Sequence, residues 1–351
     1  NEIQQRIAET DKLTKEIKEE QSDYTDDNID AVIKVVRKRF PSEFLNKLPI
    51  YFQSQINKIA ASINFLQLNI WNEFNTTSVP LSLLEYLLEL NIESVSKPTF
   101  EKNYNIVKKK HQAYGQFNGG EILENKPIGF PREGGELKPY SNLFYWAHAW
   151  SEKGSTIGLH PHQGFEIMSF VTKGSIEHYD TAHKEWRKLE KGAAQIIRAG
   201  NGISHSEKIN PKGHMFQIWF DPNLNKSIQQ EASYDDYPDE VFPITEENGV
   251  KTKTYRGEDS PLQMESEGVL IVEKFLPSGT HILSFLKDKI NALYLVKGEV
   301  TLGEEIMEVD DFCLVKDQES VEFDVKDEAQ IFIVSSPQQL SYPSYAETYG
   351  S

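Results

Sequence analysis

The 351-residue sequence predicts an all-β protein of two stacked barrels, preceded by an α-helical N-terminal segment. Composition changes sharply along the chain, because all 21 glycines lie at or after Gly115 and all nine histidines lie at or after His111. From there on, short β-branched and aromatic runs alternate with glycine or charged turns, which is typical of antiparallel sheets. We therefore expect a domain boundary near residues 105–114.

Residues 1–110 have the spacing of amphipathic helices. Apolar residues recur there every three or four positions, and prolines separate the runs. The clearest stripes are Ile3, Ile7, Leu13 and Ile17, then Ile29, Val32, Ile33 and Val36, and later Leu81, Leu84, Leu87 and Leu88. We expect a helical region of unknown function, which leaves room for a protein partner.

The distribution of charge argues against some classes of partner. Residues 1–110 carry a net charge of −1, and the other 241 residues carry −16. Such an acidic region repels phosphate backbones, so direct nucleic-acid binding is not expected. The basic run at 108–110 is interpreted as a solvated linker. No apolar stretch has the length of a membrane span, no signal peptide is visible, and the single Cys313 lies in an apolar run. A cytoplasmic protein without membrane contact is expected.

The β region divides into an expected first barrel at 111–235 and a second at 236–351. In the first, Phe165–Val171 and Ser175–Tyr179 are predicted to form a hairpin around Gly174, and 194–198 and 215–220 are predicted strands. In the second, strands are expected at 282–285, 292–296, 299–302, 312–315, 321–325 and 330–334. Residues 170–176 align with residues 294–300, an offset of 124 that supports two similar barrels.

The candidate metal ligands are two pairs of residues, each separated by one position. His160 and His162 form the first pair, and His205 and Glu207 form the second. Side chains two residues apart on a strand project from the same face, so each pair can converge on one ion. Three imidazoles and a carboxylate suit a divalent first-row metal with positions open to water, dioxygen or substrate. Shifted by 124, the first pair falls on Ser284 and Leu286, so only the first barrel is expected to bind metal.

The remaining candidates have a simpler structural interpretation. Six histidines lack a partner at this spacing and are interpreted as structural: His111, His148, His178, His183, His214 and His281. Four aromatic residues could line a substrate pocket, although ordinary barrel core is the more common role of such side chains. They are Phe170, Trp186, Phe216 and Trp219.

The segments HPHQGFE at 160–166 and AGNGISHSE at 199–207 resemble the HPHxGFE and AGxGxxHxE patterns of the pirin family. Pirins are bicupins, proteins of two stacked cupin barrels, and the resemblance covers roughly residues 112–340. It implies that the metal ligands are His160, His162, His205 and Glu207. It also implies iron as the usual metal, with Mn, Ni, Co, Cu or Zn as alternatives. Glu166 occupies a ligand position of many other cupins, and the resemblance places it beside the metal without binding it.

The resemblance implies two competing functions. Some pirins resemble quercetin 2,3-dioxygenases, which implies an iron-dependent dioxygenase for a flavonol or another small enolic aromatic substrate. Glu207 would then be both ligand and catalytic proton acceptor. Others resemble iron-dependent regulators, which implies a redox sensor or transcription cofactor that acts through protein contacts. A third interpretation is a bicupin whose metal only stabilises the barrel. Residues 1–110 depart from the usual pirin, which leaves room for a partner-binding or oligomerising role, or for a fusion specific to this protein.

Overall fold

The computed structural model describes residues 34, 36–38, 40–45, 59, 60, 63, 83, 86, 87, 104–130, 133–345 and 348. The chain divides into two compact units, Asn1–Lys102 and Asn103–Ser351. Nearly all of the helices expected in residues 1–110 lie outside the described residues. Helix α3 (Ser42–Leu45) belongs to the first unit, and Leu45 within it is buried. The described residues include no helix long and apolar enough to cross a bilayer.

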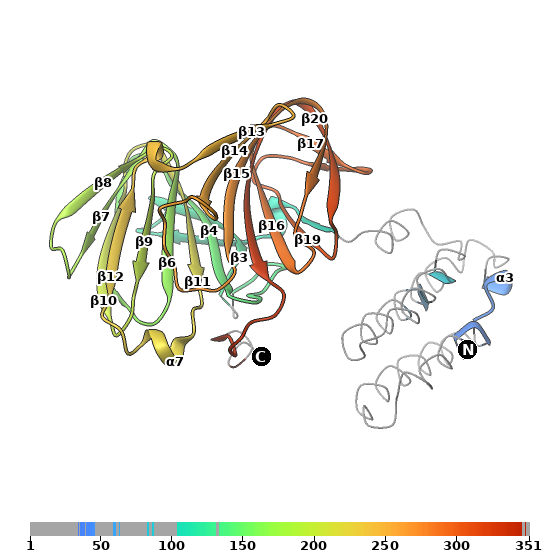
Figure 1. Cartoon of the computed structure of the whole chain (residues 1–351), viewed down its shortest axis with the longest axis horizontal. Helices are drawn as coiled ribbons and strands as arrows, with labels where there is room; N and C mark the ends of the chain where they lie inside the picture. Colours follow the sequence, from blue (N-terminus) through green and yellow to red (C-terminus); the bar gives the residue numbers. More distant parts are fainter. Residues whose placement is uncertain are drawn as a thin grey trace. The chain divides into compact units, whose positions relative to one another are not determined.

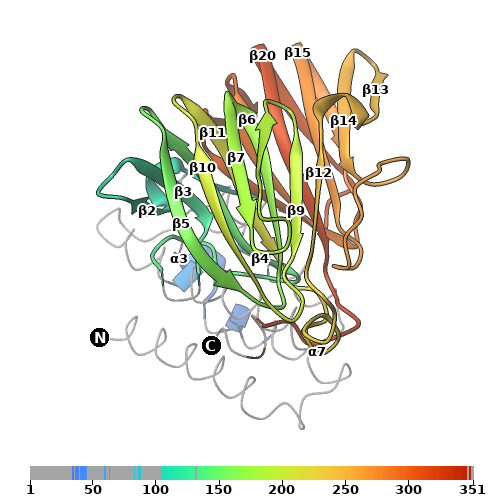
Figure 2. The same cartoon turned by 90° about the vertical axis from the view of Figure 1, so that its left-hand side faces the viewer.

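The first barrel of the second unit consists of two antiparallel sheets (Figures 1 and 2). A seven-stranded sheet has the order β12-β9-β6-β11-β4-β3-β2, and a four-stranded sheet has the order β5-β10-β7-β8. The bounds are β2 (Ala113–Phe117), β3 (Ile122–Ile128), β4 (Leu143–Ser151), β5 (Ser155–His162), β6 (Glu166–Lys173), β7 (Ser175–Asp180), β8 (Trp186–Glu190), β9 (Ala194–Arg198), β10 (Ile203–Ile209), β11 (Gly213–Phe220) and β12 (Ser233–Tyr237). A short helix, α7 (Leu224–Ser227), follows β11.

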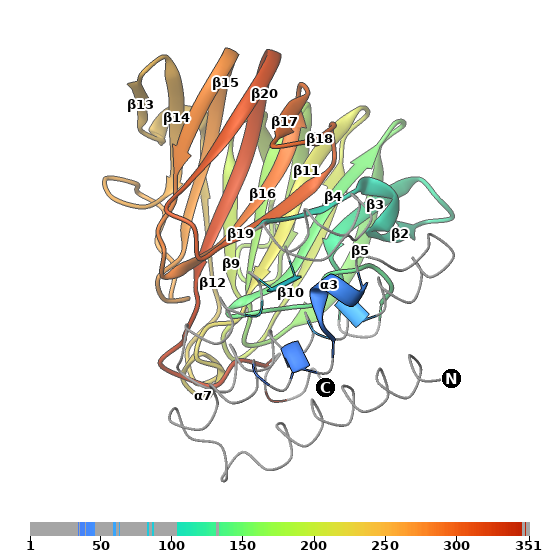
Figure 3. The ribbon, with the colours of Figure 1, turned by 90° about the vertical axis from the view of Figure 1, so that its right-hand side faces the viewer.

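The second barrel is a single nine-stranded antiparallel sheet (Figure 3). Its main order is β1-β19-β16-β20-β15-β14-β13, and β17 joins β18 to β20. The bounds are β1 (Tyr104–Val107), β13 (Ile244–Glu247), β14 (Val250–Arg256), β15 (Leu270–Ser284), β16 (Lys289–Lys297), β17 (Val300–Leu302), β18 (Glu305–Met307), β19 (Phe312–Lys316) and β20 (Ser320–Pro337). Two 3-10 turns, η3 (Lys109–His111) and η4 (Asp239–Val241), lie outside the sheets.

Strands β15 and β20 are longer than expected. The strands predicted at 321–325 and 330–334 are one strand of 18 residues, and the strand predicted at 282–285 is the end of 15-residue β15. Their pairing shifts register between Pro277 and Gly279. Such an irregularity bends a strand locally without ending it, which is why the apolar runs looked separate in the sequence.

The expected hairpin at Gly174 is wrong. Strand β6 pairs with β9 and β11, whereas β7 pairs with β8 and β10 of the other sheet. Both edges of β6 are occupied, so the turn carries the chain from one sheet to the other. Gly174 has φ 65°, and the equivalent Gly298 has φ 94°. This left-handed backbone region explains the glycine in both copies of the repeat.

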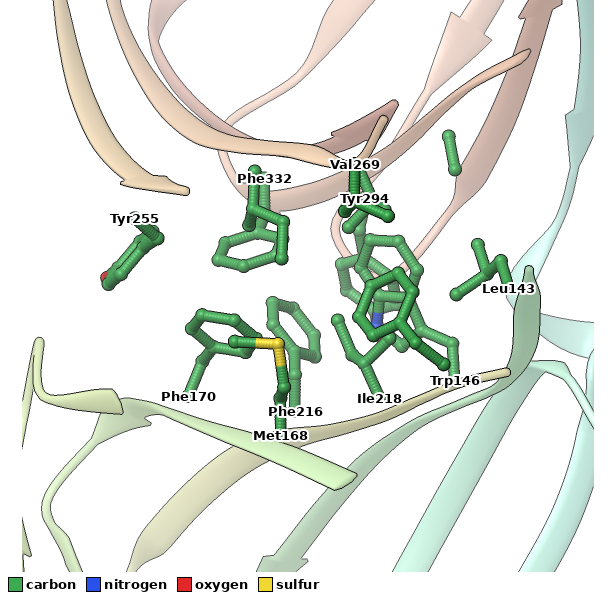
Figure 4. Packing of buried hydrophobic residues seen from close by; sticks show 14 of the residues in the cluster. Leu143, Trp146, Met168, Phe170, Phe216, Ile218, Tyr255, Val269, Tyr294 and Phe332 are labelled. Atoms are coloured by element: carbon green, nitrogen blue, oxygen red, sulfur yellow. The ribbon is translucent and has the colours of Figure 1, made fainter. Parts of the chain in front are cut away.

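The barrels pack face to face through one aromatic core (Figure 4). Residues alternate along β6, so Met168 and Phe170 point outward from the first barrel into this core. Phe216 and Trp146 do the same from β11 and β4, and Tyr294 and Phe332 meet them from the second barrel. Cys313 is buried in a separate core inside the second barrel, as its apolar context predicts.

The basic run at 108–110 is not a free linker. Lys108 and Lys109 form salt bridges of 2.7 Å with Asp311 and Asp310, respectively. The preceding β1 pairs with β19, so residues 104–107 belong to the second barrel and not to the N-terminal region. The acidic partners of the basic run lie about 200 residues further along the chain, so local sequence does not reveal these salt bridges.

Candidate metal centre

Three of the four predicted ligands meet on the four-stranded sheet. Strands β5 and β10 are antiparallel neighbours, and His205 is paired directly with His160. The ring centroids of His160, His162 and His205 are 4.5 to 4.8 Å apart. Their ligand atoms all lie within 4.8 Å of one another. We call these three residues the histidine cluster.

A β-bulge shapes this cluster. His205 pairs with His160, but Glu207 pairs with Ile157, so β5 contains one extra residue within this stretch. His160 Nδ1 is 2.7 Å from the backbone oxygen of Gly158 in the same stretch. A carbonyl only accepts, so Nδ1 must carry the proton and Nε2 is left with a lone pair. This is the tautomer that a metal-binding histidine has when its second nitrogen is held by a carbonyl.

Two residues of the histidine cluster, His162 and His205, have lowered pKa values. Burial and the neighbouring His205 and His160 lower the pKa of His162 to about 3. Burial, again with His160, lowers the pKa of His205 to about 2. His162 Nε2 and both ring nitrogens of His205 are buried and have no hydrogen-bond partner among the described residues. Buried polar atoms without partners are rare and point to a missing ion or water.

Glu207 lies beside His205 in a polar network of its own. Its Oε1 accepts hydrogen bonds of 3.0 Å from Ser169 and 3.1 Å from Gln195, and its Oε2 accepts one from Gln217. These partners come from β6, β9 and β11, so the inner face of the seven-stranded sheet fixes the carboxylate. Glu207 is 1% exposed.

Glu207 lies close to His178, a histidine that sequence spacing does not identify as a ligand. The ligand atoms of His178, His205 and Glu207 lie within 4.8 Å of one another. His178 is fully buried and is paired with Glu207 across β7 and β10. Its Nε2 is 2.9 Å from Asp180, and its buried Nδ1 has no partner among the described residues. Only the pairing of distant strands brings His178 here, and a single sequence gives no signal of that pairing.

Glu166 does not lie beside the histidine cluster. It shares the outward face of β6 with Met168 and Phe170, whereas Ser169 on the opposite face contacts Glu207. Glu166 accepts hydrogen bonds from the backbone N–H groups of Glu265 and Ser266, at 2.6 and 2.8 Å. The Ser266 hydroxyl donates a third, at 2.6 Å. A residue that binds metal in many other cupins therefore fastens the connection to the second barrel.

Aromatic side chains border the histidine cluster on one side. The Trp219 ring lies 4.8 Å from His162 at 89°, and its Nε1 donates to Gln217 at 3.2 Å. Phe130 and Tyr145 pack on Trp219. Of the four aromatics considered from sequence, Phe170 and Phe216 belong to the inter-barrel core, and Trp186 is 48% exposed on β8.

A surface pocket of about 500 Å³ opens at the same end of β5 and β10. Seven residues line it: Pro161, His162, Gln163, Thr181, Gly202, Ile203 and Ser204. This volume lies within the range of small-molecule sites. His162 therefore belongs both to the histidine cluster and to the lining of this open surface pocket.

The donor set fits a divalent transition metal. Neutral imidazoles with free lone pairs are the form in which histidine binds metal, and a buried carboxylate lies beside them. The histidine cluster offers three ligands. His205 also belongs to the group of His178, His205 and Glu207, which makes Glu207 the adjacent candidate for a fourth ligand.

Two stacked β-barrels with a histidine and carboxylate group in the first define a bicupin. Residues 136–220 match the family model described as Pirin, so the first barrel contains a Pirin family domain. A quercetin 2,3-dioxygenase of Escherichia coli is 25% identical over 191 residues, 53% of this chain and 78% of that protein. Human pirin is 26% identical over 151 residues, 41% of this chain and 51% of that protein.

Solved structures show the same fold. YhhW of Escherichia coli, a bacterial pirin in complex with nickel(II), matches with a TM-score of 0.54 at 20% identity. The match covers 67% of this chain and all of that one. A quercetin 2,3-dioxygenase of Acinetobacter baumannii matches with a TM-score of 0.53 at 15% identity. In that case 67% of this chain and 86% of the other are covered.

Proposed function

We propose that the chain binds one divalent transition metal through His160, His162, His205 and Glu207. The observation that carries this proposal is the set of buried, neutral ring nitrogens without hydrogen-bond partners among the described residues. Iron is the metal we expect, with Mn, Ni, Co, Cu or Zn as alternatives. The nickel complex of the E. coli pirin supports a first-row metal in this family without deciding which one acts here.

We further propose a dioxygenase that acts on a flavonol or another enolic aromatic. Two observations support this activity: relatives named quercetin 2,3-dioxygenase, and a pocket of about 500 Å³ that includes His162. The bound metal would supply Lewis-acid and redox chemistry. The protein must then orient a planar substrate, exclude bulk water and accept a proton.

Glu207 is the proposed proton acceptor. A carboxylate within reach of an enolic hydroxyl can act as general base, and its position must be fixed for the transfer to be efficient. Ser169 and Gln195 hold Oε1, and Gln217 holds Oε2. Gln217 also accepts a hydrogen bond from Trp219, so a substrate ring that packs on the indole would be placed relative to the same carboxylate.

Oxygen consumption tests the proposal directly. The protein is loaded anaerobically with Fe²⁺ and assayed in air with quercetin and a panel of other flavonols. We expect slow ring cleavage that is lost in Glu207→Gln and His160→Ala, with metal content measured in parallel. His281→Ala, a histidine of the second barrel, is the control and should keep the wild-type rate.

A fully metallated wild type with no turnover on any flavonol would overturn the dioxygenase assignment. A protein partner that binds the ferric form and not the ferrous form would then favour the regulatory function.

A further inference from the structure

A second cavity, separate from the histidine cluster, lies between the two barrels. It has a volume of about 340 Å³. Lys173, Lys191 and His214 line it from the first barrel, and Tyr294 and Lys297 line it from the second. The seven-stranded sheet separates it from the proposed metal site, because the residues that hold Glu207 are on the opposite face of β6 and β11 from Phe170 and Phe216.

The mouth of this cavity is positively charged. Lys173, Lys191 and Lys297 are all exposed, and only Lys297 has a salt bridge, to Glu328, among the described residues. Lysines without acidic partners are notable in a chain with 54 acidic and 37 basic residues. In a strongly acidic molecule, a local group of cations is where an anion can approach.

The carboxylate that lines the cavity is already neutralised. Asp310 pairs with Lys109 at 2.7 Å and accepts a hydrogen bond of 3.0 Å from the Tyr294 hydroxyl. His148 Nδ1 is 3.0 Å from that hydroxyl oxygen, and His148 Nε2 is 3.1 Å from His214 Nδ1. Because Asp310 only accepts, the Tyr294 hydroxyl donates to it and His148 Nδ1 donates to the Tyr294 oxygen; His148 Nδ1 also lies 3.3 Å from Asp310. The network compensates the negative charge and leaves the lysines available.

Part of the cavity lining is apolar. Phe216 and Tyr294 are buried, their ring centroids lie 4.7 Å apart, and Val296 and Val309 add aliphatic surface to the lining. A pocket with an apolar interior and a few convergent charges is the usual form of a small-molecule site. This lining favours a ligand with an anionic group and an apolar body.

We propose that this inter-barrel cavity binds a small organic anion, with its carboxylate or phosphate held by Lys173 and Lys191 and its apolar body against Phe216. The site lies on the contact between the barrels, so the bound anion lies next to Tyr294 and Lys297 of β16 in the second barrel. Neither the metal nor Glu207 takes part.

Calorimetric titration of the full chain in about 0.15 M salt tests the site. The probes are phthalate, phenyl phosphate and inorganic phosphate, which separate carboxylate from phosphate and test the need for an apolar body. We expect one saturable site per chain, tighter for at least one organic anion than for inorganic phosphate. Chelator-treated protein should bind equally well.

Two double variants, each lacking two lysines, test whether the anion binds in this cavity. Lys173→Ala with Lys191→Ala should weaken binding roughly 10- to 100-fold, since two charge-assisted contacts are lost. Lys184→Ala with Lys188→Ala removes the same charge from exposed positions outside the cavity and should change affinity less than about twofold. All four lysines are exposed, so both variants should fold, and thermal melting checks this.

Three outcomes would overturn the proposal. One is the absence of saturable binding for every probe up to roughly 10 mM. Another is an equal loss of affinity in the two paired variants, which would indicate a general charge effect. The third is binding that disappears when the metal is removed, which would place the anion in the pocket beside His162.

Discussion

His160 and His205 face each other across β5 and β10, with ring centroids 4.5 Å apart. Two imidazoles at this separation, with His162 beside them, form a potential chelating group that the two strands hold in place. Preorganisation of this kind lowers the cost of binding, because the strands and not the metal order the ligands.

Removal of His205 should abolish metal binding. His205 belongs to both groups of candidate ligands, so His205→Ala breaks either arrangement. We expect a loss of affinity larger than the roughly 10- to 100-fold caused by removal of an outer hydrogen-bond partner. His281→Ala should retain the metal. Elemental analysis after gel filtration measures both variants, and a fully metallated His205→Ala protein would contradict the site.

His178→Ala distinguishes the two overlapping groups. If the metal binds the histidine cluster, His178 is a neighbour of Glu207 and its loss lowers affinity only modestly. If the metal instead binds His178, His205 and Glu207, the variant loses it while His160→Ala keeps it. We expect the first result, and competition with a metal-binding dye measures the two affinities.

Stability of the metal-free protein should fall in mild acid. The unfolded chain takes up protons on histidine near pH 6.5, whereas folded His162 and His205 stay neutral to about pH 3 and pH 2. Acid therefore favours the unfolded state, and stability present above pH 6.5 is lost as pH falls toward 3. For His205 the slope is at most about 1.4 kcal/mol per pH unit, and for partly exposed His162 it is smaller.

Urea denaturation at a series of pH values checks this slope. The variant His205→Gln cannot titrate at that position, so its free energy of unfolding should depend less on pH between 6.5 and 3 than that of the wild type. Identical slopes for the two proteins would show that His205 does not remain neutral in the folded state.

Glu166→Ala should destabilise the fold without affecting the metal. The carboxylate accepts three hydrogen bonds from Glu265 and Ser266 and is 1% exposed. Its removal leaves buried donors unpaired, which costs about 2–4 kcal/mol. The midpoint of thermal unfolding should fall while the metal-to-protein ratio stays at the wild-type value. Loss of metal from a folded Glu166→Ala protein would indicate that Glu166 helps to bind the metal.

The region that starts at Asn103 should fold independently of the preceding residues. It contains all of β1, whose four residues pair with β19, and Tyr104 donates a 2.8 Å hydrogen bond to Leu302. We expect residues 103–351 to fold and bind metal. A protein that starts at residue 111 loses β1 and the salt bridges of Lys108 and Lys109, and should melt at a lower temperature. Aggregation of residues 103–351 would show that the N-terminal region is needed for the fold.

Local spacing was sufficient to predict some of these features, and non-local pairing decided the others. The i, i+2 histidines share a strand face because side chains alternate, and this needs no knowledge of the fold. His178 lies beside Glu207 because β7 pairs with β10. Strand β7 joins the four-stranded sheet, and does not pair with β6, because β9 and β11 already occupy both edges of β6. Neither strand pairing can be inferred from the residues next to His178 or Gly174 in the sequence.

The orientation of Glu166 follows from local alternation along β6. Glu166 shares its strand face with Met168 and Phe170, two apolar residues that a buried outer face requires, so alternation alone indicated that it points away from Ser169. The bulge between His205 and Glu207 is different, since an extra residue in β5 becomes visible only once both strands are aligned.

An anomalous difference map from crystals of metal-loaded protein tests the central claim most directly. We predict one peak per chain, with His160, His162, His205 and Glu207 as its protein ligands at about 2.0–2.2 Å. A peak bound by His178, His205 and Glu207 without His160 and His162, or no peak in the first barrel, would contradict the proposed metal centre.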